Sequence, residues 1–486
     1  MKKLYSLALS ITMLIGLMSG MTACGDDDEN EDPVEPKITI SLRSCSISEG
    51  TEYYATDLKE VTLSYNNVVS VSPSANITLN GTKCTAKSGS TTAMDVVINL
   101  PALEDGTSYK LDIPAGSIVS KTDPTVSAPA LQVNFTTKAK ASVNIPAQPI
   151  TASTEPAKKL YTFFRNNYGK KVVSSVMADV NWNTRIAEKV KTLTGKYPAM
   201  NCFDFIHVYV PNQGSNGWID YTDIKPVREW AEAGGIVQLM WHFNVPLSET
   251  TEVKTNGSGV TCTPSETTFK AANALKEGTW ENKWFYQEMD KVIDVVLKLQ
   301  DAGIAATWRP FHEAAGNATL RSGEPWGKAW FWWGYDGAGT FKQLWTAMYD
   351  YFHQKGVNNL IWIWTTQNYN GSSTTYAQDT DWYPGDRYCD MVARDLYGCN
   401  ADVNAQEFDE IQALYPTKMV VLGECGKSGA NEPGLIGDCW AKGARWGHFM
   451  VWYQGGQGST DSMCGDAWWK DALQSDVVLT RDEVTF

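Results

Sequence analysis

The chain has 486 residues, which is too long for one compact core and allows two or three domains. Its formal net charge of -14 argues against a nucleic-acid partner, because phosphate binding depends on neutralisation by Lys and Arg. Aromatic residues make up 12% of the chain and include 20 Trp, whose rings pack well on the C–H face of a sugar. Most Trp residues are expected in cores, so only those at strand ends indicate a binding site.

The N-terminus has the pattern of an export signal. Lys2 and Lys3 precede an apolar stretch over residues 4–18, which is too short to span a bilayer comfortably. Small residues lead into Cys24, and residues 21–24 resemble a lipobox, in which the cysteine becomes the lipidated first residue of a bacterial lipoprotein. The alternative is an ordinary signal peptide cleaved near Ala23. We predict a lipoprotein signal peptide over residues 1–24.

An acidic segment over residues 25–37 follows the lipobox. Its composition is typical of a solvated tether. It also resembles the surface-export signal of some Gram-negative outer-membrane lipoproteins. We therefore expect a protein anchored in the bacterial outer membrane by a lipid on Cys24 and facing the cell exterior.

Nine further cysteines follow, an odd number. In an exported protein some of them could pair, for example Cys45 with Cys84, but the sequence does not give the connectivity. Their spacing matches no metal site, and most are expected to be small buried hydrophobic residues.

Residues 38–138 read as a small all-β domain. Short alternating segments broken by turn residues predict six strands, over residues 38–42, 60–64, 75–79, 94–100, 108–113 and 131–136, with a hairpin turn at Asn80 and Gly81. The pattern indicates a β-sandwich, and it resembles the immunoglobulin-like modules that precede catalytic domains in such lipoproteins. Because this segment has no Trp and no His, a spacer role is favoured over sugar binding.

Residues 139–156 are rich in Ala, Pro, Ser and Thr and predict a semi-rigid linker to a second domain over residues 157–486. Buried strand-like runs there alternate with helical periods. The predicted strands cover residues 172–177, 200–206, 236–241, 304–309, 359–364, 391–395, 419–423 and 449–452. The predicted helices cover residues 184–193, 221–233, 282–302, 340–355, 405–414, 434–441 and 467–474. Eight βα units predict an α/β fold, the (β/α)8 or TIM barrel, and an open doubly wound sheet is the alternative.

Polar and aromatic residues concentrate where the predicted strands end. In a barrel these positions lie around one rim. Two of them are glutamates, Glu313 after the fourth strand and Glu424 after the seventh. A retaining glycosidase needs one carboxylic acid to protonate the leaving oxygen and one carboxylate to attack the anomeric carbon. Each glutamate alone could equally form a rim salt bridge, whereas the pair predicts a glycosidase.

The two glutamates suit different roles. Glu313 fits the acid, because the apolar neighbours Trp308 and Phe311 would raise its pKa by desolvation. Glu424 fits the nucleophile, held as a carboxylate by donors such as Arg309 or the Tyr397 hydroxyl.

Five stretches of the second domain resemble glycoside hydrolase family 26, the β-mannanase family. They are residues 241–246, 309–313, 330–334, 382–386 with Asp395 and Tyr397, and 423–426. The resemblance covers nearly all of residues 157–486 and implies Glu313 as acid/base and Glu424 as nucleophile. It also implies that His312 and Tyr397 line the site, that Asp395 supports Tyr397, and that Trp241, Trp333 and Trp452 form walls around the cleaved sugar. His207 and His242 are either substrate-binding residues or buried hydrogen-bonding residues.

The chain departs from the family pattern after the acid, where Ala314 and Ala315 stand and residues 317–329 form an insertion. The expected activity is a retaining, endo-acting β-1,4-mannanase on mannan, glucomannan or galactomannan, acting as a monomer without cofactor or metal. The same family acts on β-1,3-xylan and mixed-linkage β-glucan, which remain alternatives. Two further alternatives are a metal-dependent barrel hydrolase and a non-catalytic surface glycan-binding lipoprotein.

Overall fold

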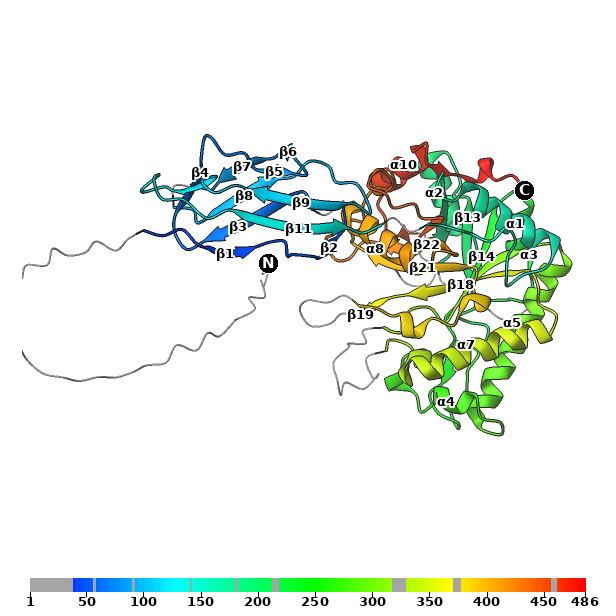
Figure 1. Cartoon of the computed structure of the whole chain (residues 1–486). Coiled ribbons are helices and arrows are strands. Elements are labelled where there is room, and N and C mark those ends of the chain that lie inside the picture. The colour runs from blue at the N-terminus through cyan, green and yellow to red at the C-terminus, as the bar shows by residue number, and fades with distance from the viewer. Residues whose placement is uncertain are drawn as a thin grey trace, which may run out of the picture. The chain divides into compact units, whose positions relative to one another are not determined.

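The structure is a computed structural model that describes residues 38–55, 58–89, 92–139, 142–179, 182–211, 218–316, 329–369, 377–455 and 461–486. The predicted signal peptide with Cys24, the acidic tether and residues 317–328 of the insertion lie outside these ranges. The chain forms two compact units, which divide after Lys140 (Figure 1). Within the described ranges, no helix combines the length and apolar character that a membrane span requires.

The N-terminal unit consists of β-strands around one hydrophobic core. One sheet has the order β1 (Leu42–Cys45), β3 (Glu60–Tyr65), β8 (Asp95–Asn99), β7 (Thr85–Ser88). Another has the order β2 (Glu52–Tyr53), β11 (Leu131–Thr137), β9 (Ser108–Ile113), β5 (Thr78–Leu79), β6 (Thr82–Lys83), and β10 (Ile118–Ser120) pairs with β4 (Val69–Val71). Alternate residues of both larger sheets, such as Leu63, Ile98 and Phe135, share the core. The unit is therefore an all-β module, as predicted.

Some details of this unit differ from the sequence prediction. The hairpin turn is confirmed, since Asn80 and Gly81 have φ values of 47° and 82° between the paired strands β5 and β6. The first strand begins at Leu42 instead of residue 38, and the short strands β2, β4, β6, β7 and β10 were not predicted. Cys45 and Cys84 are not bonded, because all nine cysteines of the described ranges are free thiols.

The C-terminal unit is the predicted (β/α)8 barrel. Its parallel strands are β12 (Val172–Met177), β13 (Met200–Asp204), β14 (Ile236–Trp241), β17 (Ala306–Pro310), β18 (Leu360–Thr366), β21 (Met391–Tyr397), β22 (Met419–Gly426) and β23 (His448–Val451). Pairing of β12 with both β13 and β23 closes the barrel, and β26 (Val478–Leu479) adds to β12 from outside the ring. All eight strands were predicted, with ends that differ by a few residues.

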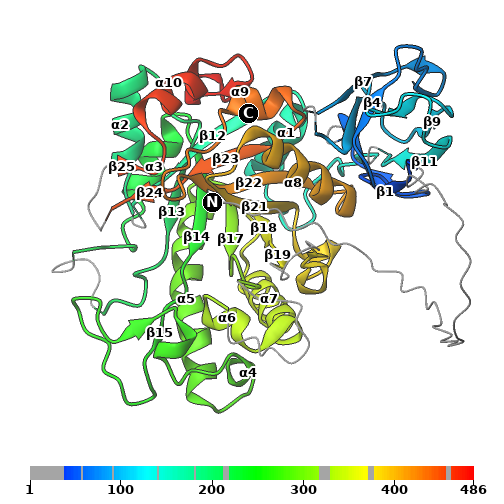
Figure 2. The same cartoon turned by 90° about the vertical axis from the view of Figure 1, so that its left-hand side faces the viewer.

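Helices surround the strands (Figure 2). Those that follow successive strands are α2 (Arg185–Thr194), α3 (Lys225–Glu232), α5 (Trp280–Asp301), α7 (Gly337–Gln354), α8 (Ala401–Leu414), α9 (Ile436–Ala441) and α10 (Asp466–Gln474). The short helices α4 (Ala271–Ala274) and α6 (Trp332–Tyr335) and the first helix of the unit, α1 (Glu155–Asn167), were not predicted. The predicted linker therefore runs into α1, and Thr151 within it is buried and donates a hydrogen bond to Asp390.

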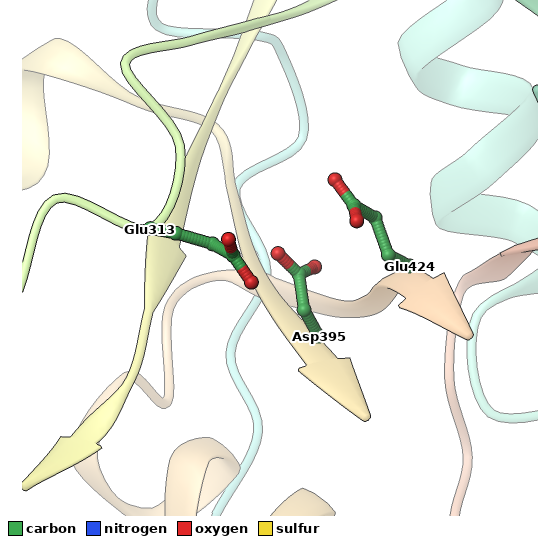
Figure 3. A group of neighbouring side chains, drawn as sticks. All are labelled: Glu313, Asp395 and Glu424. Atoms are coloured by element: carbon green, nitrogen blue, oxygen red, sulfur yellow. The ribbon is translucent and has the colours of Figure 1, made fainter. Parts of the chain in front are cut away.

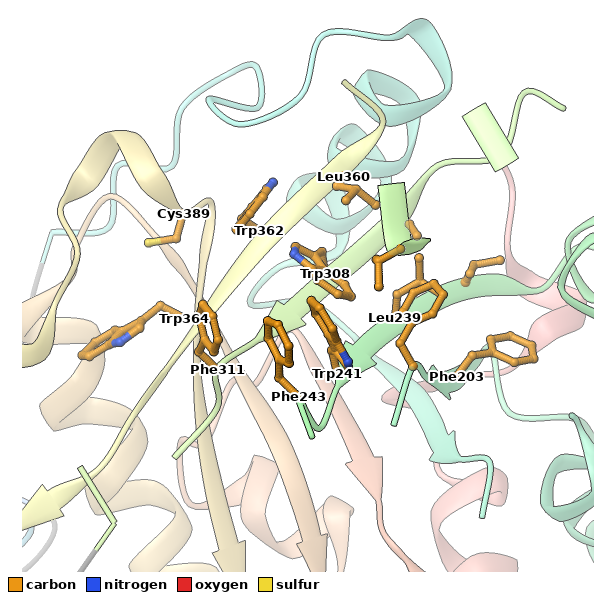
Figure 4. Packing of buried hydrophobic residues seen from close by; sticks show 14 of the residues in the cluster. Phe203, Leu239, Trp241, Phe243, Trp308, Phe311, Leu360, Trp362, Trp364 and Cys389 are labelled. Atoms are coloured by element: carbon orange, nitrogen blue, oxygen red, sulfur yellow. The ribbon is translucent and has the colours of Figure 1, made fainter. Parts of the chain in front are cut away.

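Strand alternation gives the barrel an inner and an outer apolar layer. On the inner face, Ile236, Ile363 and Met391 belong to one cluster with residues of α1. On the outer face, Leu239, Trp308 and Trp362 pack in the layer between strands and helices (Figure 4). The face on which a residue lies therefore decides whether its side chain points into the barrel or towards the surrounding helices.

Candidate active site

Three carboxylates meet at the carboxyl ends of the barrel strands. Glu313 follows β17, Asp395 lies on β21 and Glu424 lies on β22 (Figure 3). One carboxylate oxygen from each residue lies within 4.8 Å of one from each of the others. The structure thus brings together Glu313 and Glu424, which lie 111 residues apart in the sequence.

The backbone at both glutamates is irregular. Phe311 and Glu313 have φ values of 46° and 51°, in the left-handed region that non-glycine residues rarely adopt. The register of β21 with β22 shifts so that Arg394 pairs with Leu422 but Asp395 pairs with Glu424, which leaves Gly423 as an extra residue. A Cβ on Gly423 would lie 2.6 Å from an Asp395 oxygen. The bulge therefore requires glycine, and it sets the position of Glu424.

Arg309 holds two of the three acids from inside the barrel. Its buried guanidinium donates to Glu424 through Nη1 at 2.6 Å, to Asp395 through Nη2, and to the Thr365 hydroxyl through Nε at 2.8 Å. The Tyr397 hydroxyl donates to the other Glu424 oxygen. Burial raises the pKa of Tyr397 well above its usual range, so the phenol keeps the proton that it donates. Glu424 therefore has a charged and a neutral donor, which stabilise it as a carboxylate.

Glu313 has the opposite environment. Burial raises the pKa of Glu313 well above its usual range, and the nearby Asp395 and Glu424 charges raise it further. Burial also raises the pKa of Asp395, although Arg309 opposes that shift. Trp308 does not take part as predicted, because it lies on the outer face of β17 against Phe352. The cluster thus combines a Glu313 whose pKa is raised by burial with a Glu424 whose two oxygens accept hydrogen bonds from Arg309 and Tyr397.

The spacing of the three acids would also suit a metal ion. The guanidinium of Arg309 already binds Asp395 and Glu424 and brings a positive charge into the same space. A second cation would be repelled at that position. The donor set therefore fits an arginine-held carboxylate pair better than a metal centre.

Histidines form one wall beside Glu313. The His242 ring lies 4.5 Å from the His312 ring, edge to face. The buried carboxylate of Asp204 accepts hydrogen bonds from the His242 backbone N–H at 3.0 Å and from Nδ1 of its ring. Burial lowers the pKa of His312 well below its usual range, so this ring is neutral. Sequence reasoning missed Asp204, although its place at the end of β13 was the same signal that selected Asp395.

Trp241 and Trp333 differ from their expected role as walls of the sugar site. Trp241 is 1% exposed and stacks on Phe243 at 3.7 Å, because the inner-face neighbour on β14 is Met240 and Trp241 points outward (Figure 4). Trp333 is also fully buried, and its Nε1 donates to the His312 carbonyl at 2.9 Å. The structure places Trp333 as a support for His312 and Trp241 as a core residue.

The remaining predicted residues lie around the same rim. Trp452 follows β23, is partly exposed, and its ring lies 5.7 Å from that of His242. His207 follows β13, and its ring lies 4.6 Å from that of Trp218. Burial lowers the pKa of His207 to about 4, so it is neutral at ordinary pH. Trp452 thus contacts the ring of His242, whereas the ring of His207 contacts Trp218.

Residues 150–482 match the profile of the family described as glycosyl hydrolase family 26. A mannan endo-1,4-beta-mannosidase of Thermothelomyces thermophilus is 32% identical over 339 residues, which are 68% of this chain and 61% of that protein. Two mannan endo-1,4-beta-mannosidases of a Piromyces species are 29% and 28% identical, and this chain spans 49% and 52% of their lengths. These curated relatives are therefore considerably longer than the part that matches.

Solved structures show the same likeness. The family 26 domain of an endo-beta-mannanase/endo-beta-glucanase from Prevotella bryantii is 54% identical, covers 70% of this chain and 100% of that chain, and has a TM-score of 0.67. A beta-mannanase from a symbiotic protist of the termite Reticulitermes speratus, complexed with gluco-manno-oligosaccharide, is 30% identical. It covers 71% of this chain and 99% of that chain, with a TM-score of 0.55.

Proposed function

The chain belongs to glycosyl hydrolase family 26, and from this membership and the geometry of its acids we propose that it is a retaining, endo-acting β-1,4-mannanase. The observation that carries the proposal is the distance of at most 4.8 Å between oxygens of Glu313 and Glu424. Retaining glycosidases place their two carboxyl groups about 5 to 5.5 Å apart, whereas inverting ones leave about 6.5 to 9.5 Å for a water molecule. The separation in this chain supports direct attack.

In the proposed reaction, Glu424 attacks the anomeric carbon while Glu313 gives its proton to the leaving glycosidic oxygen. The bond to that oxygen breaks as the bond to Glu424 forms, which leaves a glycosyl-enzyme ester and a Glu313 carboxylate. Glu313 then takes a proton from water, the water oxygen attacks the same carbon, and Glu424 leaves. Arg309 and Tyr397 hold Glu424 for the first step through their hydrogen bonds to its two oxygens.

Mannan, glucomannan and galactomannan are the proposed substrates. The names of the Thermothelomyces and Piromyces relatives support mannan. The name of the Prevotella protein includes an endo-beta-glucanase activity, so mixed-linkage β-glucan is the second candidate. His242 and Trp452, which are partly exposed and whose ring centroids lie 5.7 Å apart, are proposed to line the cleaved sugar, and the buried His312 is proposed to support His242.

Hydrolysis of galactomannan tests the proposal. We expect the wild-type chain to release reducing ends, Glu424→Ala to release none above background, and EDTA to have no effect. Early products of mixed length from unbranched mannan would show endo action, whereas a single short sugar would show exo action. Activity on barley β-glucan or β-1,3-xylan without activity on mannan would mean that the chain is a β-glucanase or β-1,3-xylanase instead of a mannanase. Binding of these polysaccharides without hydrolysis would favour the glycan-binding alternative.

The parts outside the barrel carry further proposals. We propose that residues 1–24 are a lipoprotein signal peptide, that Cys24 carries the lipid, and that residues 25–37 tether a monomer to the outer face of the outer membrane. We also propose that the all-β unit is an immunoglobulin-like spacer. Incorporation of labelled palmitate into the wild type but not into Cys24→Ala would support the anchor, and digestion by protease added to intact cells would support surface exposure. Equal labelling of both forms would contradict the lipid assignment.

A further inference from the structure

Trp218 has an unusual surface position for a Trp of this chain. It is 42% exposed, and Trp330 is the other Trp among the exposed large apolar residues of the described ranges. By contrast, the Trp residues of the barrel wall, such as Trp308 and Trp362, are at most 1% exposed. An indole ring on the surface loses the favourable free energy of burial, because its apolar area stays in contact with water. A Trp that is exposed in this way therefore suggests a ligand-binding position.

The chain topology places Trp218 on the catalytic face. It lies between β13 and α3, and the segment that holds it, around Thr255, lies between β14 and α5. Both connections leave the carboxyl ends of barrel strands. Glu313 and Glu424 stand at the same ends of β17 and β22, so all four positions belong to one rim.

The indole is held firmly on that rim. Its Nε1 donates to the Thr255 carbonyl at 3.1 Å, and the Tyr209 hydroxyl donates to the Gly257 carbonyl at 2.8 Å. Gly257 has φ 83°, and a Cβ there would lie 3.5 Å from the Trp218 ring and 3.2 Å from the Tyr209 oxygen. The ring is thus packed along one edge and fixed by a hydrogen bond. Because the side chain is already ordered, it would lose little conformational entropy when a ligand binds.

Aromatic rings follow the ends of the neighbouring strands β13, β14 and β17 between Trp218 and the acids. The centroid of the His207 ring lies 4.6 Å from that of Trp218 at a 72° interplanar angle. His207 follows β13, which pairs with β14, the strand that ends just before His242. The ring of His242 in turn meets that of His312, the residue before Glu313. Trp218 therefore lies on the β13 side of the rim, beside the strands that precede His242 and Glu313.

We propose that Trp218 is the platform of a distal subsite that stacks on one sugar unit of a β-1,4-linked chain, away from the unit that is cleaved. The ligand class is a pyranose whose C–H face covers the free indole face. The Trp218 N–H is not available to the sugar, because it already donates to the Thr255 carbonyl. The indole would therefore bind the sugar by stacking alone. This inference rests on the proposed glycosidase function, since it extends the same substrate along the rim.

Substrate length gives the test. We expect Trp218→Ala to lower kcat/KM for mannohexaose about five- to tenfold, mainly through KM, and to change it less than about twofold for mannotriose. Trp218→Phe should lie between the wild type and Trp218→Ala. The matched control is Trp440→Ala, which removes a partly exposed indole on α9 that stacks with Arg445 at 4.2 Å. It should leave both substrates unchanged.

Two results would overturn the subsite. An equal loss on both substrates would show that Trp218 only supports the fold, and an unchanged kcat/KM for mannohexaose would show that it touches no substrate. If the wild type cleaves neither oligosaccharide, the proposed function fails instead. Calorimetric binding of mannohexaose to the Glu313→Gln chain, with and without Trp218→Ala, then still decides the inference, because equal affinities would contradict it.

Discussion

The two ends of the barrel interior are built from the same strands but have different chemistry. At the amino end, the inner face carries apolar side chains such as Ile236, Ile363 and Met391, which pack with α1. At the carboxyl end, the same inner face carries Arg309, Asp395 and Glu424. The amino end of the strands therefore contributes stability through apolar packing, whereas the carboxyl end holds charged groups whose burial is unfavourable.

Backbone regularity follows the same division. The inner-face register at the amino end of β21 and β22 is uninterrupted from Met391 to Arg394. The carboxyl end contains the Gly423 bulge and two non-glycine residues with positive φ, Phe311 and Glu313. Such conformations cost about 1 to 3 kcal/mol each and persist where the surrounding packing enforces them. The proposed catalytic residues therefore stand where the barrel is least regular.

The largest expected effect comes from the proposed nucleophile. We expect Glu424→Ala to lower kcat on mannan by about 10⁴-fold or more, because the covalent intermediate can no longer form. The matched control is Glu288→Gln, which alters a buried glutamate of α5 that binds Lys291 outside the site. Reducing-end assays on both variants make the comparison. Comparable losses in the two would mean that disturbance of any buried acid, and not chemistry, explains the effect.

The proposed acid should give the next largest effect. Glu313→Gln should lower kcat/KM on mannan by about 10² to 10⁴-fold and should lower kcat/KM much less on an aryl mannoside, whose leaving group needs no proton in the first step. Because the pKa of Glu313 is raised, its acid form persists above the usual range and activity should fall as pH rises through that raised pKa. The folded chain should also lose stability as the pH rises from the usual pKa of a glutamate to the raised pKa of Glu313, because the folded state then holds a proton that the unfolded state has lost. Glu313→Gln should not show that loss. A Glu313→Gln variant that is equally impaired on both substrates would contradict the acid role.

Arg309 is expected to contribute to both activity and stability. Arg309→Met should lower kcat/KM by about 10²-fold, because Glu424 and Asp395 lose their shared donor. It should also lower the melting temperature, since removing one partner of a buried ion pair costs about 3 to 5 kcal/mol. Thermal unfolding and steady-state kinetics measure the two effects. An active variant with unchanged stability would show that the Arg309 guanidinium neither positions Glu424 and Asp395 nor stabilises their charges.

Asp204 is expected to act through His242. Asp204→Asn should lower kcat/KM by about tenfold, because the amide cannot fix the Nδ1–H form of the ring as the carboxylate does. The tautomer of the His242 ring, followed by NMR, should shift away from the Nδ1–H form in the variant. Loss of activity with an unchanged tautomer of His242 would instead indicate a general disturbance of β13.

The smallest expected effect on activity comes from the amino end. Ile363→Ala removes a fully buried side chain and should cost about 2 to 5 kcal/mol of unfolding free energy. At a temperature where the variant is folded, its kcat should match that of the wild type. A reduced kcat in the folded variant would show that the two ends of the interior are not independent.

Sequence reasoning found the barrel because buried strands and amphipathic helices leave periodic patterns, as in α5. It placed Glu313 and Glu424 by their positions after such strands. It failed for Trp241, because proximity to a strand end was considered without strand alternation, which puts Met240 inside and Trp241 outside. It also missed α1, although Thr154 and Pro156 form an N-terminal capping pattern, because the surrounding composition resembled a linker. The Gly423 bulge and the Arg309 ion pairs depend on tertiary contacts that no local pattern contains.

The stereochemistry of hydrolysis tests the central claim most directly. Proton NMR of mannohexaose cleavage, recorded faster than mutarotation, reports the anomer that forms first at the new reducing end. Direct attack by Glu424 across a gap of at most 4.8 Å predicts that the β-anomer forms first and the α-anomer appears only by later equilibration. An α-anomer that forms first would mean inversion through a water molecule, and it would contradict the double-displacement account.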